Sequence, residues 1–246
     1  QFIVDKNDDV YIIEVNPRSS RTVPFLSKST GYCLADIGTL AILGVSLKKQ
    51  GFDTICPPKK EKWYVKAPAF SFSKLRGLDA YLSPEMKSTG EAIGYDRKMT
   101  RALYKALQAS GMQVVNYGTV FVTIADKDKD EALPLIRRFY NMGFYIEATA
   151  GTAQFLKGHG IKTRIRKKIS EGSEEILNSI RQGYVNYVIN TRAYDSPSAS
   201  GAESDGQQIR RCAVENGVTV FTALDTVKAL LDVLQEMTME ISTIDM

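Results

Sequence analysis

The sequence predicts an α/β protein whose C-terminal part is a doubly wound, parallel, five-stranded sheet. From residue 112 onward, short runs rich in β-branched and aromatic residues alternate with amphipathic helical segments. Before residue 112 this alternation is absent, and turns, extended stretches and helices follow one another irregularly. We therefore expect two domains, an α+β domain at residues 1–111 and the parallel-sheet domain at 112–246.

The strands expected in the C-terminal domain cover residues 118–125, 143–149, 162–168, 184–190 and 217–221. The helices expected between and after them cover residues 128–142, 151–160, 173–183, 205–216 and 223–237. Because each crossover between parallel strands needs a connection of this length, five strand–helix units indicate an open sheet with helices on both faces. Ligands of such sheets bind at the carboxyl ends of the strands.

The N-terminal domain is expected to open with a β-hairpin in residues 1–15, where a run of Asn and Asp separates two β-favouring segments. The later elements expected are a loop at 16–31, a helix at 32–50, an extended stretch at 57–75, a turn-rich segment at 82–96 and a helix at 96–110. Gly111 supplies the stop of that last helix. Because the chain enters the hairpin at once, we interpret it as a piece of a longer protein.

Composition and charge narrow the classes of function. The 246 residues are 43% hydrophobic and 24% charged, as in soluble globular proteins, and no apolar run is long enough to span a bilayer. A net charge of +4 fits the binding of small anions and is too weak to indicate nucleic acid. The three cysteines are far apart and form no CxxC pair, which favours a reducing cytoplasm.

The N-terminal region holds a candidate metal and phosphate site. Glu14 and Asn16 lie two residues apart on an expected strand, so both side chains point to one face. Carboxylate and amide oxygens suit Mg²⁺, and Arg18 and Arg21 follow in a position to contact phosphate oxygens. The alternative is a polar strand end with solvated arginines.

The string "IEVNPRSSRTVPF", preceded by "QFIVDKNDDVY", resembles the end of the ATP-grasp domain of the carbamoyl-phosphate synthase large chain. The string "LSPEMKSTGEAIGYD" resembles the turn that follows it in that family. The resemblance implies Mg²⁺ or Mn²⁺ at Gln1, Glu14 and Asn16, with Arg21 and Arg18 near the ATP phosphates. No glycine-rich phosphate loop or adenine-pocket lysine is present in this sequence. We therefore expect this chain alone to lack the synthase activity.

A second candidate site lies in the C-terminal domain. In "IEATAGTAQFLKGHG" a strand ends at Thr149 and a helix begins near Thr152, so hydroxyls and free helix N–H groups form a cup for an anion. The basic side chains expected on one face of the neighbouring strand are Lys162, Arg164, Arg166 and Lys168. Lys129, Lys168 and Asn190 all fall near strand ends at the ligand-binding edge.

This domain resembles the methylglyoxal-synthase-like regulatory domain that ends the same large chain, over roughly residues 112–246. The resemblance implies binding of a nucleotide or sugar phosphate of the UMP, IMP or PRPP type. The matching positions are Lys129, Thr149, Thr152, Lys168 and Asn190, with Thr191 adjacent and Arg192 in place of an expected threonine. Tyr64 stands where some members have a glutamate for ornithine, so ornithine control is not expected.

The resemblance implies an ATP-dependent ligase that makes carbamoyl phosphate from bicarbonate, glutamine-derived ammonia and two ATP for pyrimidine and arginine synthesis. The implied partners are the glutaminase small chain and the remaining N-terminal part of the large chain. One alternative is a methylglyoxal-synthase-type lyase, but His159 lies at the far end of the helix from the anion cup. The others are a phosphate-binding module and, more weakly, a nucleic-acid binder through the basic strand.

Overall fold

The computed structural model describes residues 1–53, 61–71, 80–81, 86–191 and 204–238. The chain forms two compact units, Gln1–Glu61 and Lys62–Met246. The division thus falls after Glu61, so residues 62–111 group with the parallel sheet and not with the N-terminal residues. The reason is that the helix at residues 99–109 packs on the helix at residues 224–238, the last one that the structure describes.

The first unit opens with the expected hairpin, in which β1 (Phe2–Val4) pairs antiparallel with β2 (Val10–Ile12). Asp8, in the connecting turn, has a φ of 66°, a left-handed conformation that Asp tolerates better than most residues. The second strand ends at Ile12, earlier than the sequence suggested. Glu14 and Asn16 therefore lie beyond the strand.

Two short helices follow, α1 (Thr22–Thr30) and α2 (Leu34–Ile42). The first replaces part of the loop expected at 16–31: Pro24 falls in the first turn, where no helical N–H is needed. The second is shorter than the expected helix at 32–50. Gly44, with a φ of 87°, follows its C-cap and stops it.

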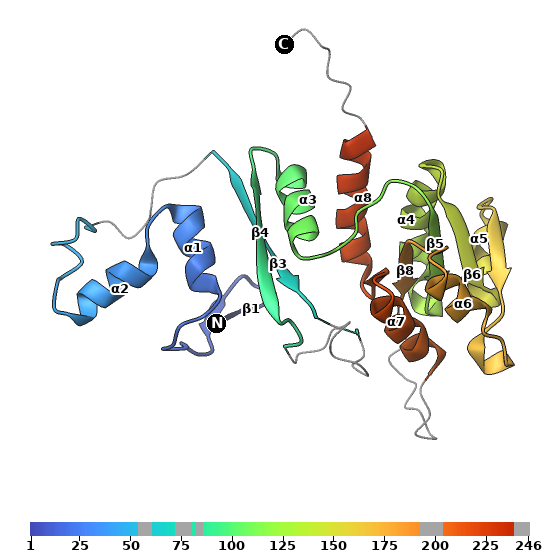
Figure 1. Ribbon diagram of the computed structural model, residues 1–246, viewed down its shortest axis with the longest axis horizontal. Helices are drawn as coiled ribbons and strands as arrows, with labels where there is room; N and C mark the ends of the chain where they lie inside the picture. The colour runs from blue at the N-terminus through green and yellow to red at the C-terminus, as the bar shows by residue number, and fades with distance from the viewer. Residues whose placement is uncertain (54–60, 72–79, 82–85, 192–203, 239–246) are drawn as a thin grey trace, which may run out of the picture. The chain divides into compact units, whose positions relative to one another are not determined.

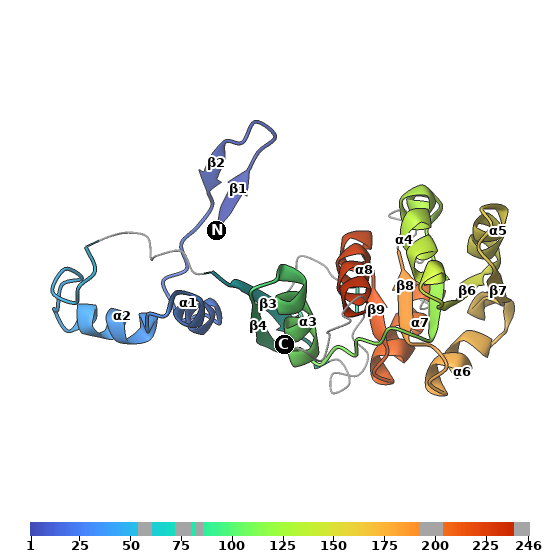
Figure 2. The ribbon, with the colours of Figure 1, turned by 90° about the horizontal axis from the view of Figure 1, so that it is seen from above.

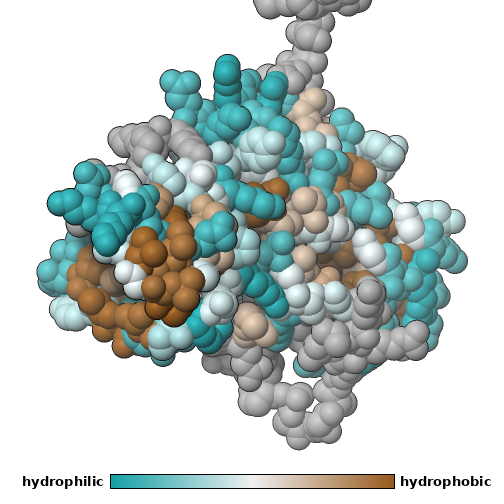
Figure 3. Space-filling model, turned by 60° about the vertical axis from the view of Figure 1, so that its left-hand side comes forward, coloured by the Kyte–Doolittle hydropathy of each residue, from teal (hydrophilic) through white to brown (hydrophobic). Residues whose placement is uncertain are grey.

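Apolar side chains of the first unit remain uncovered. Ile42 is 88% exposed and Val15 81% exposed, and the hairpin residues Phe2 and Ile12 exceed 60%. Figure 3 shows hydrophobic residues gathered into a broad patch on one face. Exposed apolar surface of this kind marks a surface that contacts another part or partner.

The second unit begins with β3 (Trp63–Ala69) and β4 (Gly90–Asp96), paired antiparallel, and α3 (Met99–Ala109) packed on them. Half of the segment expected to be turn-rich is thus a strand. Gly94 lets the helix approach, because a Cβ there would collide with the backbone of Ala102 and Ala106. Gly111, with a φ of 91°, follows the helix as expected.

The remainder is the predicted five-stranded parallel sheet, in the order β7-β6-β5-β8-β9 (Figures 1 and 2). Its strands are β5 (Thr119–Thr123), β6 (Tyr145–Thr149), β7 (Thr163–Arg166), β8 (Tyr187–Asn190) and β9 (Thr219–Phe221). Its helices are α4 (Lys129–Asn141), α5 (Ala150–Gly158), α6 (Glu175–Arg181), α7 (Asp205–Glu215) and α8 (Leu224–Thr238). Two 3₁₀ turns, η1 (Asp126–Asp128) and η2 (Ile169–Glu171), follow β5 and β7.

Alternating strand residues place helices on both faces of the sheet. Val120, Ile146 and Tyr187 point into a core shared with α4, α5 and α8. Phe121 and Val188 point the opposite way, into a second core with α6 and α7. The doubly wound architecture is therefore confirmed. Among the described residues, no helix is both long and apolar enough to cross a membrane.

Candidate ligand site at the carboxyl edge of the sheet

The carboxyl ends of β5 and β8 form the switch point of the sheet. The chain leaves β5 toward β6 and β7 with helices on one face, then returns to β8 with helices on the other. Connections that diverge in this way leave a crevice outside the strand ends, where doubly wound proteins bind ligands. The predicted residues at this edge are Lys129, Thr149, Thr152, Lys168, Asn190 and Thr191. Arg192 lies outside the described residues.

Two of the threonines fix the loop that leaves β5. The backbone N–H of Ile124 donates to Thr152 Oγ1 at 3.3 Å, and that of Ala125 donates to Thr191 Oγ1 at 2.9 Å. Thr191 in turn donates its own N–H to the carbonyl of Thr123 at 3.2 Å. Each hydroxyl accepts one bond here and keeps its proton for another acceptor.

The residues of the predicted anion cup lie at the start of α5. Thr149 is the N-cap, buried to 7% exposure, and its side chain caps no helical N–H group. Apart from its chain neighbours and its own helix backbone, no atom of the described residues lies within 4 Å of the position that a Cβ on Gly151 would take. The helix begins at Ala150, slightly earlier than expected, and its first N–H groups have no acceptor within the helix.

Lys129 and Lys168 bring positive charge to the same edge. The Nζ of Lys129 lies 2.6 Å from Asp126 Oδ1 and 5.8 Å from the ring centre of Phe155. The hydrogen bond and charge of Lys129 lower the pKa of Asp126, and the charge of Lys168 acts in the same direction. The two lysines, one after the central strand β5 and one after the outer strand β7, thus act on one carboxylate.

Arg210 is a residue of this site that sequence reasoning missed. It is 3% exposed, donates from Nη1 to the Oδ1 of Asn190, and lies over the ring of Tyr81 at 5.6 Å. Gly206 leaves room for this contact, since a Cβ there would come within 3.2 Å of the guanidinium. The available signal was a charged residue among the buried positions of α7, beside Ile209 and Ala213.

Asp205 ties the loop after β7 to the start of α7. Its carboxylate accepts from the Ser170 backbone N–H at 3.1 Å and from the Ser170 hydroxyl at 2.9 Å. Ser204 caps the same helix by accepting from the Gln207 N–H. These bonds hold Lys168, two residues before Ser170, near the helix that carries Arg210.

The basic strand is partly neutralised. Arg166 donates to Glu147 through Nε and Nη2, each at 2.7 Å, and both side chains are largely buried. The Glu147 carboxylate raises the pKa of Arg166 above its usual value. The strand ends at Arg166, so Lys168 does not share its face as expected. This pairing leaves less free positive charge for a nucleic acid than the sequence suggested.

His159 lies at the other end of α5 from the cup. It is the C-cap residue, its Nδ1 bonds to the Phe155 carbonyl at 2.9 Å, and its ring packs on the Phe155 ring. A side chain engaged at the far helix end is out of hydrogen-bond reach of a ligand at Thr149.

The candidate metal residues meet at the open end of the hairpin. Asn16 Nδ2 donates to Glu14 Oε1 at 3.0 Å, and the backbone of Gln1 bonds to Glu14 and Ile13. One carboxylate and two amides offer hard oxygen atoms, which fit Mg²⁺ that shares its shell with phosphates. Arg21 is the N-cap of α1 and Arg18 is exposed in the loop before it. Within the described ranges, no cluster of three or more His, Cys, Asp or Glu residues could hold a metal.

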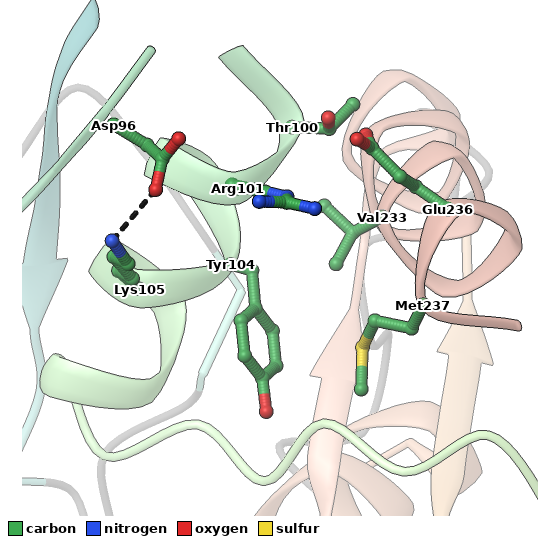
Figure 4. Close-up of a pocket in the computed structure, with 8 residues that line it drawn as sticks. All are labelled: Asp96, Thr100, Arg101, Tyr104, Lys105, Val233, Glu236 and Met237. Atoms are coloured by element: carbon green, nitrogen blue, oxygen red, sulfur yellow. Dashed lines mark hydrogen bonds and ion pairs between the residues drawn. The ribbon is translucent and has the colours of Figure 1, made fainter. Parts of the chain in front are cut away.

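Two cavities lie away from this edge. One, of about 370 Å³, separates α3 from α8, and Figure 4 shows side chains of both helices facing across it. Both carboxylates of its lining are paired: Asp96 with Lys105 at 2.7 Å, and Glu236 with Lys98, which lies outside the lining, at 3.3 Å. The other, of about 950 Å³, lies beside Tyr145 of β6 and Arg164 of β7. Neither contains the residues that converge at the switch point.

Comparison with protein families finds two matches in the order that the sequence resemblance implied. Residues 1–50 match the model of the "Carbamoyl-phosphate synthase L chain, ATP binding domain". Residues 131–222 match the model of the "MGS-like domain". The second match spans β6 to β9 and includes the start of α5.

Proposed function

We propose that this chain, which belongs to the carbamoyl-phosphate synthase large-chain family and carries an MGS-like domain, binds a phosphorylated small molecule at the carboxyl edge of its parallel sheet. The observation that carries the proposal is the convergence of cations, hydroxyls and a free helix start at the switch point. The chemical class of ligand is a nucleotide or sugar phosphate, of the UMP, IMP or PRPP type.

Each group has a role in holding phosphate. The N–H groups at the start of α5 and the hydroxyl protons of Thr149 and Thr152 donate to phosphate oxygens. Lys129 and Lys168 supply charge-assisted bonds. Asn190 Oδ1 accepts from Arg210, so the group that Asn190 would offer to the ligand is its amide NH₂. Thr191 extends the site toward the sugar or base, and the resemblance adds Arg192, which lies outside the described residues.

Ligand binding regulates the synthase if the ligand prefers one of two states of the large chain. The contact between Arg210 and Tyr81 supports such a coupling, because it joins the edge of the sheet to the segment before β4. A ligand that draws Asn190 toward itself changes the partner of Arg210, and thereby the contact of Arg210 with Tyr81.

The N-terminal segment contributes to the ATP site of the synthase. Gln1, Glu14 and Asn16 would hold Mg²⁺ or Mn²⁺, which neutralises charge on the ATP phosphates, and Arg21 and Arg18 would bind their oxygens. The proposed reaction forms carbamoyl phosphate from bicarbonate, glutamine-derived ammonia and two ATP. It requires the glutaminase small chain and the rest of the large chain as partners, takes place in the cytoplasm, and involves no nucleic acid.

Calorimetric titration of the chain with UMP, IMP and PRPP tests the ligand site. We expect at least one to bind, and Lys129→Ala and Lys168→Ala each to weaken it about 10- to 100-fold, the loss of a charge-assisted bond. Lys157→Ala, in the last turn of α5, is the matched control and should leave affinity unchanged. Absence of binding by all three compounds would overturn the proposal. Formation of methylglyoxal from dihydroxyacetone phosphate would instead make the domain a lyase.

A further inference from the structure

Asp126 places a carboxylate among the cations of the ligand site. It is the first residue of η1, directly after the loop that leaves β5, and its Oδ1 lies 2.6 Å from Lys129 Nζ. Residues three apart in a 3₁₀ turn lie one above the other, which brings this pair into register. The Asp126 side chain is 95% exposed, whereas that of Lys129 is 18% exposed. The carboxylate thus covers the ammonium from the solvent side.

A second cation acts on the same carboxylate from a different element. Lys168 precedes η2, and its positive charge adds to the effect of Lys129 in lowering the pKa of Asp126. No ion pair of Lys168 is found among the described residues. Lys129 contacts the Asp126 carboxylate directly, and Lys168, after the neighbouring strand ends, acts on it only through its charge, so an anion in the place of that carboxylate lies in the field of both lysines.

We propose that Asp126 is an internal counter-anion, whose carboxylate takes the position of the ligand's phosphate on Lys129 and must leave it when the ligand binds. The proposal rests on the proposed function, because it assigns a specificity role within that site. A ligand with one negative charge replaces the Asp126 carboxylate by another single charge, so the gain in binding free energy is small. A phosphate dianion contacts both lysines and displaces Asp126 with a net gain, so the residue selects dianionic ligands.

The surroundings allow the side chain to leave without moving the loop. The N–H groups of Ile124 and Ala125 are anchored to Thr152 and Thr191, so the backbone just before Asp126 is fixed. The side chain itself is solvent-exposed, and exposed ion pairs are weak. Rotation about χ1 of Asp126 therefore uncovers Lys129 at small cost.

An opposite role for Asp126 predicts the opposite result. If Asp126 only orients Lys129 toward the ligand, its removal weakens binding. If it competes with the ligand, its removal strengthens binding. The two roles are therefore separated by the direction of the change in affinity, which a merely structural effect does not reproduce.

The test is a titration of the parent chain, Asp126→Asn and Asp130→Asn with inorganic phosphate at pH 8, followed by the amide signals of Gly151 and Thr152. We expect Asp126→Asn to bind about fivefold more tightly than the parent, the value of an exposed ion pair converted to affinity. Asp130→Asn makes the same charge change in the first turn of α4 and should differ from the parent by less than about 1.5-fold.

The outcomes separate this inference from the proposed function. If the parent binds phosphate and Lys129→Ala loses it, but Asp126→Asn binds equally or more weakly, only the role of Asp126 is overturned. Equal tightening in Asp130→Asn would also overturn it, because net charge would then explain the gain. If neither the parent nor Asp126→Asn binds phosphate, the ligand site itself is wrong and the inference falls with it.

Discussion

Substitution of Tyr187 by Phe tests what anchors the sheet to the segment that precedes it. The Tyr187 hydroxyl donates to the carbonyl of Val115 at 2.8 Å and accepts from its N–H at 2.7 Å. The ring is fully buried, with its centre 6.0 Å from those of Phe139 and Phe144. Phe keeps this packing but removes both hydrogen bonds, so only the polar anchor is tested.

The expected loss in unfolding free energy is about 2 kcal/mol. An unsatisfied buried polar group costs about 1–3 kcal/mol, and because Val115 is only partly buried we take the middle of that range. Urea denaturation of the parent and Tyr187→Phe measures the loss. Tyr145→Phe on β6, where the side chain is 76% exposed, is the matched control and should change stability by less than about 0.5 kcal/mol.

The same pair of proteins carries a pH signature. Burial raises the pKa of Tyr187 to about 12 from 10.0, so folding favours the neutral hydroxyl. Its stabilising contribution is complete below pH of about 10 and is lost as pH rises through about 12, at roughly 1.4 kcal/mol per pH unit. The advantage of the parent over Tyr187→Phe should therefore shrink in that window. An advantage that is absent at pH 7, or constant to pH 12, would refute the reasoning.

Three further predictions concern packing and charge in the second unit. Gly94→Ala should lower the unfolding free energy of this unit by about 3 kcal/mol in urea denaturation, because the new Cβ meets the backbone of α3. The control Gly90→Ala, whose Cβ makes ordinary contacts only, should leave the stability unchanged, and equal losses in the two variants would contradict this. Glu147→Gln should lower the unfolding free energy by about 3 kcal/mol, because it leaves Arg166 buried without its charge partner. The double variant Glu147→Gln with Arg166→Met should recover part of this loss, and no recovery would argue against the ion pair. The Asp96 carboxyl, bonded to Lys105, should titrate by NMR at a pKa of about 2 rather than 3.8. Its stabilising effect is therefore present above pH 3.8 and is lost as the pH falls through about 2. An unchanged titration midpoint of Asp96 in Lys105→Met would contradict this cause.

The parallel sheet could be predicted because each of its strands is short and followed by a helix, and because the strands other than the basic β7 are largely apolar. The hydrophobic periodicity that predicts these elements depends only on residues close together in the sequence. The prediction errors arise where one residue is compatible with two local structures. Pro24 suggested a loop but stands in the first turn of α1, and the helix expected at 32–50 ends before Gly44, whose left-handed conformation is not visible in a helical pattern.

The candidate site was predictable only in outline. Strand ends of a parallel sheet meet at one edge, which places Thr149 and Asn190 together without knowledge of side chains. The partners of those residues depend on tertiary contacts that sequence spacing does not encode. Arg210 lies on α7, twenty residues after Asn190, and donates to it. Glu147 on β6 pairs with Arg166 on the neighbouring strand β7.

The most direct measurement of the central claim is an amide chemical-shift map of the ¹⁵N-labelled chain titrated with UMP, IMP or PRPP. The account predicts that saturable shifts concentrate at Lys129, Gly151, Thr152 and Asn190 and disappear in Lys129→Ala. Shifts centred instead on Thr100, Tyr104 and Met237, beside the cavity between α3 and α8, would contradict it.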